Sequence, residues 1–263
     1  MTTRTIVLTL ALAGAGLHPA AAQVQETHLA FPARGKQVNL TIYRPAGTPK
    51  GTIIMGSGDV GWVGLAVDLS KFLAPEGYVV VGLNVRQYLS AFTGAGTHLT
   101  PAQAQQDFHD MAAFLEARSL LPSPVIVAGV SEGAALAVLA AAAPANHDWI
   151  NGVLTMGLPA EAEIAWRWSD FTSWLTKSNA REPSFAPGDY IADVSPLPLW
   201  MIQSTKDEYV PKADYEMFRA KAKEPSRLIL IDAANHRFTD KRSELRDQVL
   251  AGLTWMQEHQ PAK

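Results

Sequence analysis

The sequence of 263 residues contains no cysteine. This absence excludes disulfides, a thiolate nucleophile, cysteine-ligated zinc and iron–sulfur clusters. The seven histidines show no H-E-x-x-H pattern and no other spacing typical of a metal site. We therefore predict a protein that binds no metal and no cofactor and that is stabilised by a sizeable hydrophobic core.

An excess of basic charge is also lacking, since 22 Lys and Arg stand against 25 Asp and Glu, a net charge of −3. The basic residues are scattered and form no stripe along the sequence. Nucleic-acid phosphates are bound by clustered Lys and Arg side chains, so this composition argues against a nucleic-acid partner.

No apolar run is long enough to span a bilayer comfortably. The N-terminal run, residues 6–17, follows Arg4 and precedes three alanines that end at Ala22, which is the pattern of a secretory signal. We predict a signal peptide over residues 1–22, cleaved after Ala22, and a single mature domain over residues 23–263 that is periplasmic or secreted. The alternative, an N-terminal membrane anchor, is disfavoured because no basic stop-transfer cluster follows the run.

Short runs of Val, Ile and Leu alternate with helical patterns along most of the chain. This alternation is typical of a mostly parallel sheet covered by helices on both faces. We expect about eight strands, of which the first two, within residues 27–45, form an antiparallel hairpin with its turn around Arg34-Gly35. The other expected strands are residues 51–56, 78–83, 124–129, 150–157, 197–204 and 227–232, and the expected helices are residues 64–77, 102–120, 132–143, 213–223 and 241–259.

One long interruption, residues 158–196, separates the sixth expected strand from the seventh. It is rich in tryptophan, proline and polar residues. A loop of this length inside a compact domain is usually functional, so we predict a cap insertion over a site.

The strongest chemical signal is the run from Gly129 to Gly133, G-V-S-E-G, which lies between a buried strand and a helix. G-x-S-x-G in this context is the nucleophile elbow, a turn so tight that only small residues fit beside the serine. We predict that Ser131 is a nucleophile. The alternative is a glycine-rich turn in which the serine is passive.

A serine hydroxyl is a weak nucleophile until a base takes its proton. His236 follows a strand and precedes the last helix, and it fits the role of the base better than the other histidines do. The base needs a carboxylate to orient it, and Asp207, just past a strand end, is the first choice, with Glu208 next. The order Ser131, Asp207, His236 is that of the α/β-hydrolase fold, which is the fold that we predict.

The loop after the third strand contains Gly56, Gly58 and Gly61, which spell G-x-G-x-x-G. This spacing also occurs in dinucleotide-binding loops. The dinucleotide interpretation is disfavoured because two strands precede the loop and no ribose-binding carboxylate ends the next strand, although Arg86 could favour a 2′-phosphate. We predict instead an oxyanion hole made by the backbone N–H groups of Asp59 and Glu132.

Four segments together, GSGDVGW, GVSEGAA, PAEAEIAWRWSDFTSW and NHRF, resemble the bacterial VirJ/AcvB family of exported α/β-hydrolase-fold proteins. The likeness runs from about Gly51 to Trp255, and the Ser-Gly-Asp-x-Gly-Trp loop is its most specific element. The resemblance implies hydrolysis of lysyl-phosphatidylglycerol, in which the lysyl ester is removed from the lipid headgroup, and it implies by position that Ser131 is the nucleophile.

Acidic and aromatic residues near the expected mouth of the site suit such a substrate, because a lysyl ester carries two positive charges. The expected substrate-binding residues are Trp62, Glu161, Glu163, Trp166 and Trp168. Tryptophan rings suit the headgroup zone of a membrane, so we expect an aminoacylated phospholipid at a membrane surface as the partner. The alternative is that these tryptophans only pack the cap onto the domain.

Two other functions are consistent with the same residues. The first is a general carboxylesterase or peptidase that acts on small soluble substrates and is indifferent to a cationic headgroup. The second is an exported interaction protein that keeps the fold without turnover, which three matched residues in the right order argue against.

Overall fold

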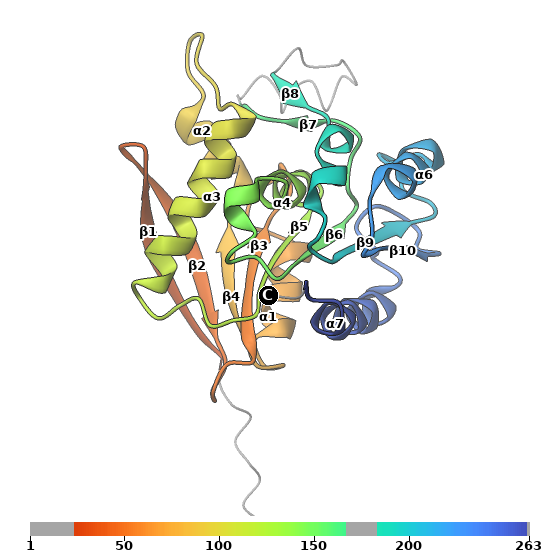
Figure 1. Ribbon diagram of the computed structural model, residues 1–263, viewed down its shortest axis with the longest axis horizontal. Coiled ribbons are helices and arrows are strands. Elements are labelled where there is room, and N and C mark those ends of the chain that lie inside the picture. Colours follow the sequence, from red (N-terminus) through yellow and green to blue (C-terminus); the bar gives the residue numbers. More distant parts are fainter. Residues whose placement is uncertain (1–23, 167–182, 262–263) are drawn as a thin grey trace, which may run out of the picture.

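The computed structural model describes residues 24–166 and 183–261. The predicted signal peptide, residues 1–22, lies outside the described residues. The described chain forms a central eight-stranded sheet in the order β1-β2-β4-β3-β5-β6-β9-β10 (Figure 1). Its strands are β1 (Gln25–Ala33), β2 (Lys36–Arg44), β3 (Gly51–Gly56), β4 (Tyr78–Leu83), β5 (Val125–Val130), β6 (Gly152–Met156), β9 (Leu199–Ser204) and β10 (Ser226–Ile231).

The six strands from β4 to β10 in this order pair in parallel, whereas β2 is antiparallel to both β1 and β4. The first two strands therefore form the antiparallel hairpin predicted from the sequence. Its turn is formed by Arg34 and Gly35, which both have positive φ, at 45° and 77°. A two-residue turn of this kind matches the right-handed twist of the strands.

Helices cover both faces of the sheet, as the alternation of patterns predicts. One face carries α1 (Leu65–Leu73) and α7 (Arg242–Glu258), and the other carries α2 (Val85–Phe92), α3 (Pro101–Glu116) and α4 (Glu132–Ala141). A further helix, α6 (Lys212–Lys221), packs Phe218 into the hydrophobic core on the face that carries α2, α3 and α4.

Local signals explain where two of these helices begin. Thr100 and Gln103 form a reciprocal capping box at the start of α3, with Pro101 in the first turn. The Asn84 side chain accepts a hydrogen bond from the Gln87 N–H at 3.1 Å and thereby caps α2. The helix α2 is not predicted from the sequence, because its eight residues follow a strand directly and carry no long apolar period.

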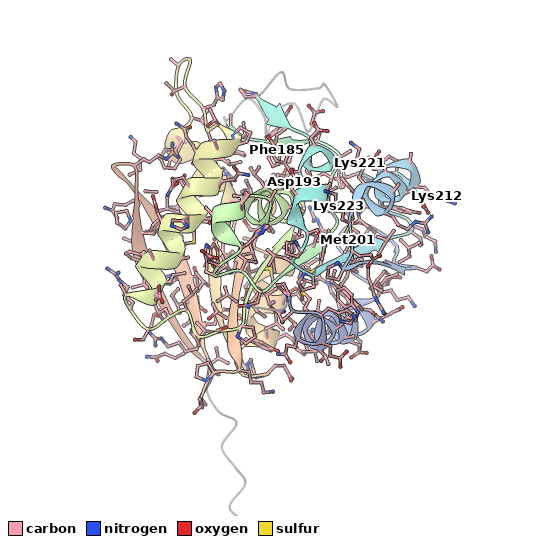
Figure 2. All side chains as sticks on the ribbon, viewed as in Figure 1. Phe185, Asp193, Met201, Lys212, Lys221 and Lys223 are labelled. Carbon is pink, nitrogen blue, oxygen red and sulfur yellow. The ribbon has the colours of Figure 1, made fainter. Side chains whose placement is uncertain are left out.

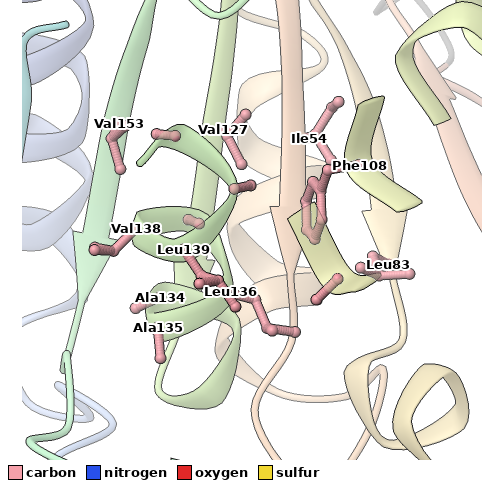
Figure 3. Packing of buried hydrophobic residues seen from close by; sticks show 14 of the residues in the cluster. Ile54, Leu83, Phe108, Val127, Ala134, Ala135, Leu136, Val138, Leu139 and Val153 are labelled. Carbon is pink, nitrogen blue, oxygen red and sulfur yellow. The ribbon is translucent and has the colours of Figure 1, made fainter. Parts of the chain in front are cut away.

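The core on the α4 face contains β3, β5 and β6 against α3 and α4 (Figure 3). Residues 133–141 of α4 are all buried, and most of them are alanines, so the helix packs close to the sheet and to α3 at the same time. The close approach of α4 to the sheet places the first residue of the helix, and the serine before it, at the carboxyl edge of the central strands.

The segment between β6 and β9 contains residues 158–196, where the sequence predicts a cap insertion. Its described parts contain β7 (Ala162–Glu163), β8 (Ser184–Phe185) and the 3-10 helices η2 (Pro187–Asp189) and η3 (Ile191–Val194), and another 3-10 helix, η1 (Pro144–Asn146), precedes β6. The two short strands pair with each other, apart from the main sheet. Figure 2 labels Phe185 and Asp193 in this insertion and Lys221 on α6, whose Nζ lies 3.5 Å from Asp189 Oδ1.

Candidate active site

Ser131 lies between the end of β5 and the start of α4 with φ 54° and ψ −121°. A positive φ is a strained conformation for a residue with a side chain, and it is characteristic of a nucleophile elbow. The Ser131 N–H donates to the Met156 carbonyl at 3.0 Å, which ties the turn to the end of β6.

Three glycines make this turn possible. A Cβ added to Gly129 would lie 2.0 Å from the carbonyl carbon of Gly133, and one added to Gly133 would lie 2.4 Å from the carbonyl carbon of Gly56. Neighbouring backbone atoms therefore occupy the positions that the Cβ of any other residue would need. The elbow is packed so tightly that its conformation follows from steric contact.

Asp207 and His236, predicted from separate loops, lie together. His236 Nδ1 is 2.7 Å from Asp207 Oδ2. The second oxygen of Asp207 accepts the N–H groups of Tyr209 at 2.9 Å and Val210 at 3.0 Å. The Asp207 side chain is fully buried, so the carboxylate is held in one orientation, and the Nδ1–H of the imidazole donates to it.

The imidazole also lies beside the elbow. A Cβ added to Gly157, the residue after β6, would meet His236 Cε1 at 2.5 Å. Met156, the preceding residue, accepts the Ser131 N–H. Ser131 and His236 therefore both contact the end of β6, although they are 105 positions apart in the sequence.

Two other carboxylates on the loops after β9 and β10, Glu208 and Asp232, have different partners. Glu208 Oε2 accepts a hydrogen bond from the His236 backbone N–H at 2.8 Å, so it fixes the loop rather than the ring. Asp232 is exposed and lies 2.9 Å from Lys206 Nζ. Its pKa is lowered, first by the hydrogen bond from Lys206 and then by the one from Thr205.

Opposing effects act on the pKa of His236. Burial has the largest effect and lowers it, but the hydrogen bond and the charge of Asp207, with smaller contributions from Glu132 and Glu208, outweigh burial and raise the pKa above its ordinary value. A more basic imidazole is a stronger acceptor for a serine proton, provided that the pH keeps it neutral.

The loop after β3 lies beside the serine, as the sequence predicts. A Cβ added to Gly58 would meet Ser131 Cβ at 3.5 Å and Glu132 Oε2 at 3.8 Å. The Asp59 N–H, predicted to bind an oxyanion, donates to Glu132 Oε2 at 3.1 Å. The loop is anchored by Ser57, whose hydroxyl accepts the Val85 N–H at 3.1 Å.

Trp62 and Trp166, two of the predicted substrate-binding residues, line one cavity of about 390 Å³ beside this loop. The Trp62 ring covers Gly82 of β4, where an added Cβ would lie 2.1 Å from the ring, so one face of the indole is core. Trp166 stacks under Arg86, whose guanidinium carbon lies 4.1 Å from the centroid of the Trp166 ring. The remaining lining residues are Val60, Gly61, Val63, Asn84, Gln87 and Ser90.

Glu161 and Glu163 lie on the insertion, at and just before β7. Glu161 is exposed and accepts a hydrogen bond from the hydroxyl of Ser184, the first residue of β8. Glu163 is half-buried. Their predicted contact with substrate stays a prediction. Trp168, the last of the predicted substrate-binding residues, lies outside the described residues.

Sequence reasoning did not single out Tyr209. Its ring packs edge-on against the His236 imidazole with centroids 5.4 Å apart, yet the residue is 53% exposed. It therefore borders the site from the solvent side. Its position two residues after Asp207 in a turn was the only signal in the sequence, and a turn does not reveal where its side chains point.

Within residues 24–166 and 183–261, no group of three His, Cys, Asp or Glu side chains is placed to hold a metal ion. Over the same residues, no helix has both the length and the apolar character required to cross a membrane.

The strand order, the elbow after β5 and the Asp–His pair on the loops after β9 and β10 define the α/β-hydrolase fold. Solved structures of this fold superpose on most of the chain. The esterase domain of a Rhodothermus marinus protein is 18% identical with a TM-score of 0.61, covering 89% of this chain and 99% of that one. Est1E from Butyrivibrio proteoclasticus is 14% identical with a TM-score of 0.63, covering 87% and 98%.

A third structure, XC6422 from Xanthomonas campestris, described as an α/β serine hydrolase without lid, is 18% identical with a TM-score of 0.58. It covers 91% of this chain, which in turn covers 97% of it. At these identities the likeness establishes the fold.

The chain belongs to the family described as bacterial virulence protein (VirJ), which matches residues 51–255. Among curated proteins, the uncharacterized protein YfhR of Escherichia coli K12 is 35% identical over 100 residues. That match covers 32% of this chain and 35% of YfhR, so the chain spans about a third of the length of this relative.

Proposed function

We propose that the protein is a serine hydrolase that cleaves a carboxylic ester, with Ser131 as nucleophile, His236 as base and Asp207 as the group that orients the base. The observation that carries this proposal is the 2.7 Å contact between Asp207 and His236 beside a strained serine elbow. A structural turn has no need of a buried carboxylate that fixes an imidazole next to it.

The reaction follows from the arrangement. Ser131 Oγ attacks the ester carbonyl while His236 Nε2 takes its proton, and Asp207 stabilises the imidazolium that forms. Backbone N–H groups of Asp59 and Glu132 bind the oxyanion of the tetrahedral intermediate. The intermediate then expels the alcohol, which takes the proton from His236, and water hydrolyses the acyl-enzyme by the same steps in reverse order.

We propose further that the ester is the lysyl ester of lysyl-phosphatidylglycerol, so the products are lysine and phosphatidylglycerol. The charges of Glu132 and Glu208 act on His236, and the charge of Asp59 acts on Glu132, so the site has a negative potential that favours a cationic acyl group. The adjoining cavity contains Arg86, whose planar guanidinium suits a phosphodiester. The indoles of Trp62 and Trp166 in the same cavity suit the headgroup region of a membrane.

The predicted signal sequence places this activity outside the cytoplasm, and we propose a periplasmic or secreted enzyme that acts at a membrane surface. In this proposal the insertion between β6 and β9 is the cap that meets the lipid. The resemblance of the family segments to lysyl-phosphatidylglycerol hydrolases is the second support for this substrate.

The test is lysine release from vesicles that contain lysyl-phosphatidylglycerol, measured for the mature protein and for Ser131→Ala. We expect release by the first and a loss of at least ~10³-fold in kcat by the second, because the nucleophile is absent. Near-normal turnover by Ser131→Ala would overturn the assignment of the nucleophile.

Two further measurements separate the alternatives. Hydrolysis of short neutral esters without lysine release would replace the lipid by small soluble substrates. Failure of Ser131 to react with a fluorophosphonate, together with no turnover of any ester, would indicate an interaction protein that keeps the fold.

A further inference from the structure

The Glu132 side chain turns back toward the elbow instead of extending into solvent from the first turn of α4. Its Oε2 accepts the Asp59 N–H at 3.1 Å. Interactions with Ser131 and with the backbone N–H of Glu132 itself also favour the charged form of this carboxylate. The Asp59 N–H is one of the two that we assign to the oxyanion hole, so a carboxylate now stands where the substrate oxygen must bind.

The surroundings of this carboxylate disfavour its charged form. Burial is the main effect that raises the pKa of Glu132, and the nearby charge of Asp59 adds to it, against hydrogen bonds from Glu132, Ser131 and Asp59 that lower it. His236, on the loop after β10, is close enough for the charge of Glu132 to act on it, whereas Lys206, on the loop after β9, pairs with Asp232 instead.

We infer that the Glu132 carboxylate is a gate in the oxyanion hole, and that the α-ammonium of an aminoacyl ester is the group that opens it and then pairs with it. This inference rests on the proposed function, since it assumes that Ser131 attacks an ester. It adds a specificity-determining residue and defines the class of acyl group as one with a cation next to the scissile carbonyl.

Covalent geometry supports this choice of cation. In an α-aminoacyl ester the nitrogen is two bonds from the carbonyl carbon, roughly 2.5 Å away. When the carbonyl oxygen enters the hole between Asp59 and Glu132, the ammonium arrives within reach of the displaced carboxylate. The hydrogen bonds that Glu132 loses in the hole are then replaced by a charge-assisted pair.

A neutral acyl group offers no such replacement. It must displace the carboxylate from the Asp59 N–H and leave the anion half-buried, which is unfavourable. The gate therefore discriminates against neutral esters without any steric barrier to them. Specificity then has two sources: a neutral ester leaves the Glu132 carboxylate unpaired, and an ester with an α-ammonium pairs with it.

The test compares lysine ethyl ester with Nα-acetyl-lysine ethyl ester, which keep the same leaving group and the same ε-ammonium and differ at the α-nitrogen. We expect the wild-type protein to favour the free amine in kcat/KM by roughly ten-fold or more, the effect of one charge-assisted hydrogen bond. Glu132→Ala should raise kcat/KM for the acetylated ester, lower it for the free amine, and bring the ratio near one.

Glu132→Gln keeps the size of the side chain and the hydrogen bond from Asp59 but removes the charge, so we expect it to lose the preference for the free amine. Glu116→Gln, an exposed carboxylate at the end of α3, is the matched charge control and should keep the wild-type ratio. The gate would be overturned if both Glu132 variants kept the wild-type ratio of kcat/KM for the two esters. If Ser131→Ala at the same time hydrolysed neither ester, the proposed function would stay intact.

The rate of labelling of Ser131 by a neutral fluorophosphonate tests the gate without turnover, because phosphonylation also places an oxygen in the oxyanion hole. We expect faster labelling of Glu132→Ala than of the wild type. Equal labelling rates for the wild type and for a Glu132→Ala protein with the wild-type melting temperature would overturn the gate. Faster labelling without hydrolysis of any ester would support the gate and overturn the proposed function.

Discussion

The candidate site has two walls that are built in different ways. The elbow wall, residues 56–59 and 129–133, is held by contacts between backbone atoms of glycines, so close that a Cβ added to Gly56, Gly129 or Gly133 would collide. The acid–base wall, residues 207–210 with His236, is held by hydrogen bonds between side chains and loop N–H groups. The elbow wall therefore depends on volume, and the acid–base wall depends on charge.

This difference predicts different failures. A small change of volume in the elbow wall should destabilise the fold, because close-packed backbone cannot move without moving β3, β5 and α4. A change of charge in the acid–base wall should leave the fold nearly intact and remove the chemistry, because its groups are already on loops. The following variants test this contrast.

The largest effect is expected for Asp207→Asn. The amide favours the wrong tautomer of His236, so Nε2 no longer accepts the serine proton, and we expect kcat to fall by roughly 10⁴-fold. The melting temperature should change little. Ester hydrolysis and thermal unfolding of the same preparation measure both quantities.

Asp232→Asn is the matched control for this variant. Asp232 lies one strand away, is exposed, and pairs with Lys206 instead of the histidine. We expect wild-type kcat. A loss of activity in this control equal to that of Asp207→Asn would contradict the assignment of the carboxylate.

Gly133→Ala should break the elbow wall. Its Cβ would lie 2.4 Å from the Gly56 backbone, so strands or helix must shift, and we expect a loss of about 3 kcal/mol or more in the free energy of unfolding. Chemical denaturation measures this loss. Gly47→Ala, where the added Cβ meets no atom within 4 Å, should be near neutral, and comparable losses in the two variants would refute the steric account.

The smallest effect is expected for Glu208→Gln, which sharpens the comparison because it changes only charge. The glutamine oxygen can still accept the His236 N–H, but one of the charges that raise the pKa of His236 is gone. A histidine acting as base must be neutral, so activity is lost as the pH falls through its pKa. The acidic limb of the kcat/KM profile should therefore move to lower pH in this variant.

The wild-type acidic limb should lie above the ordinary imidazole pKa of about 6.5, by the same argument. A Glu208→Gln profile that coincides with the wild-type profile would show that Glu208 acts only through the loop. Glu116→Gln, remote from the site, controls for the change in net charge.

The order of strands and helices could be predicted from the sequence because each buried strand is a short apolar run and most of the helices carry a helical period. The hairpin turn at Arg34 and Gly35 and the elbow at Ser131 could be predicted as well, since each requires glycine at particular positions. The helix α2 was missed, because eight residues stabilised by one cap and by packing leave little local signal.

The sequence by itself determined the fold and singled out Ser131 and His236, two of the residues that we propose for the chemistry, because strand ends in a parallel sheet meet at one edge whatever joins them. Only the tertiary structure decided between the neighbours Asp207 and Glu208, since the turn that ends at Val210 aims one at the imidazole and the other at a backbone N–H. The same holds for Glu132. Its place in the sequence predicts an amide for the oxyanion, but only the packed elbow shows its carboxylate in that hole, because the direction of a side chain depends on neighbours that the chain brings from far away.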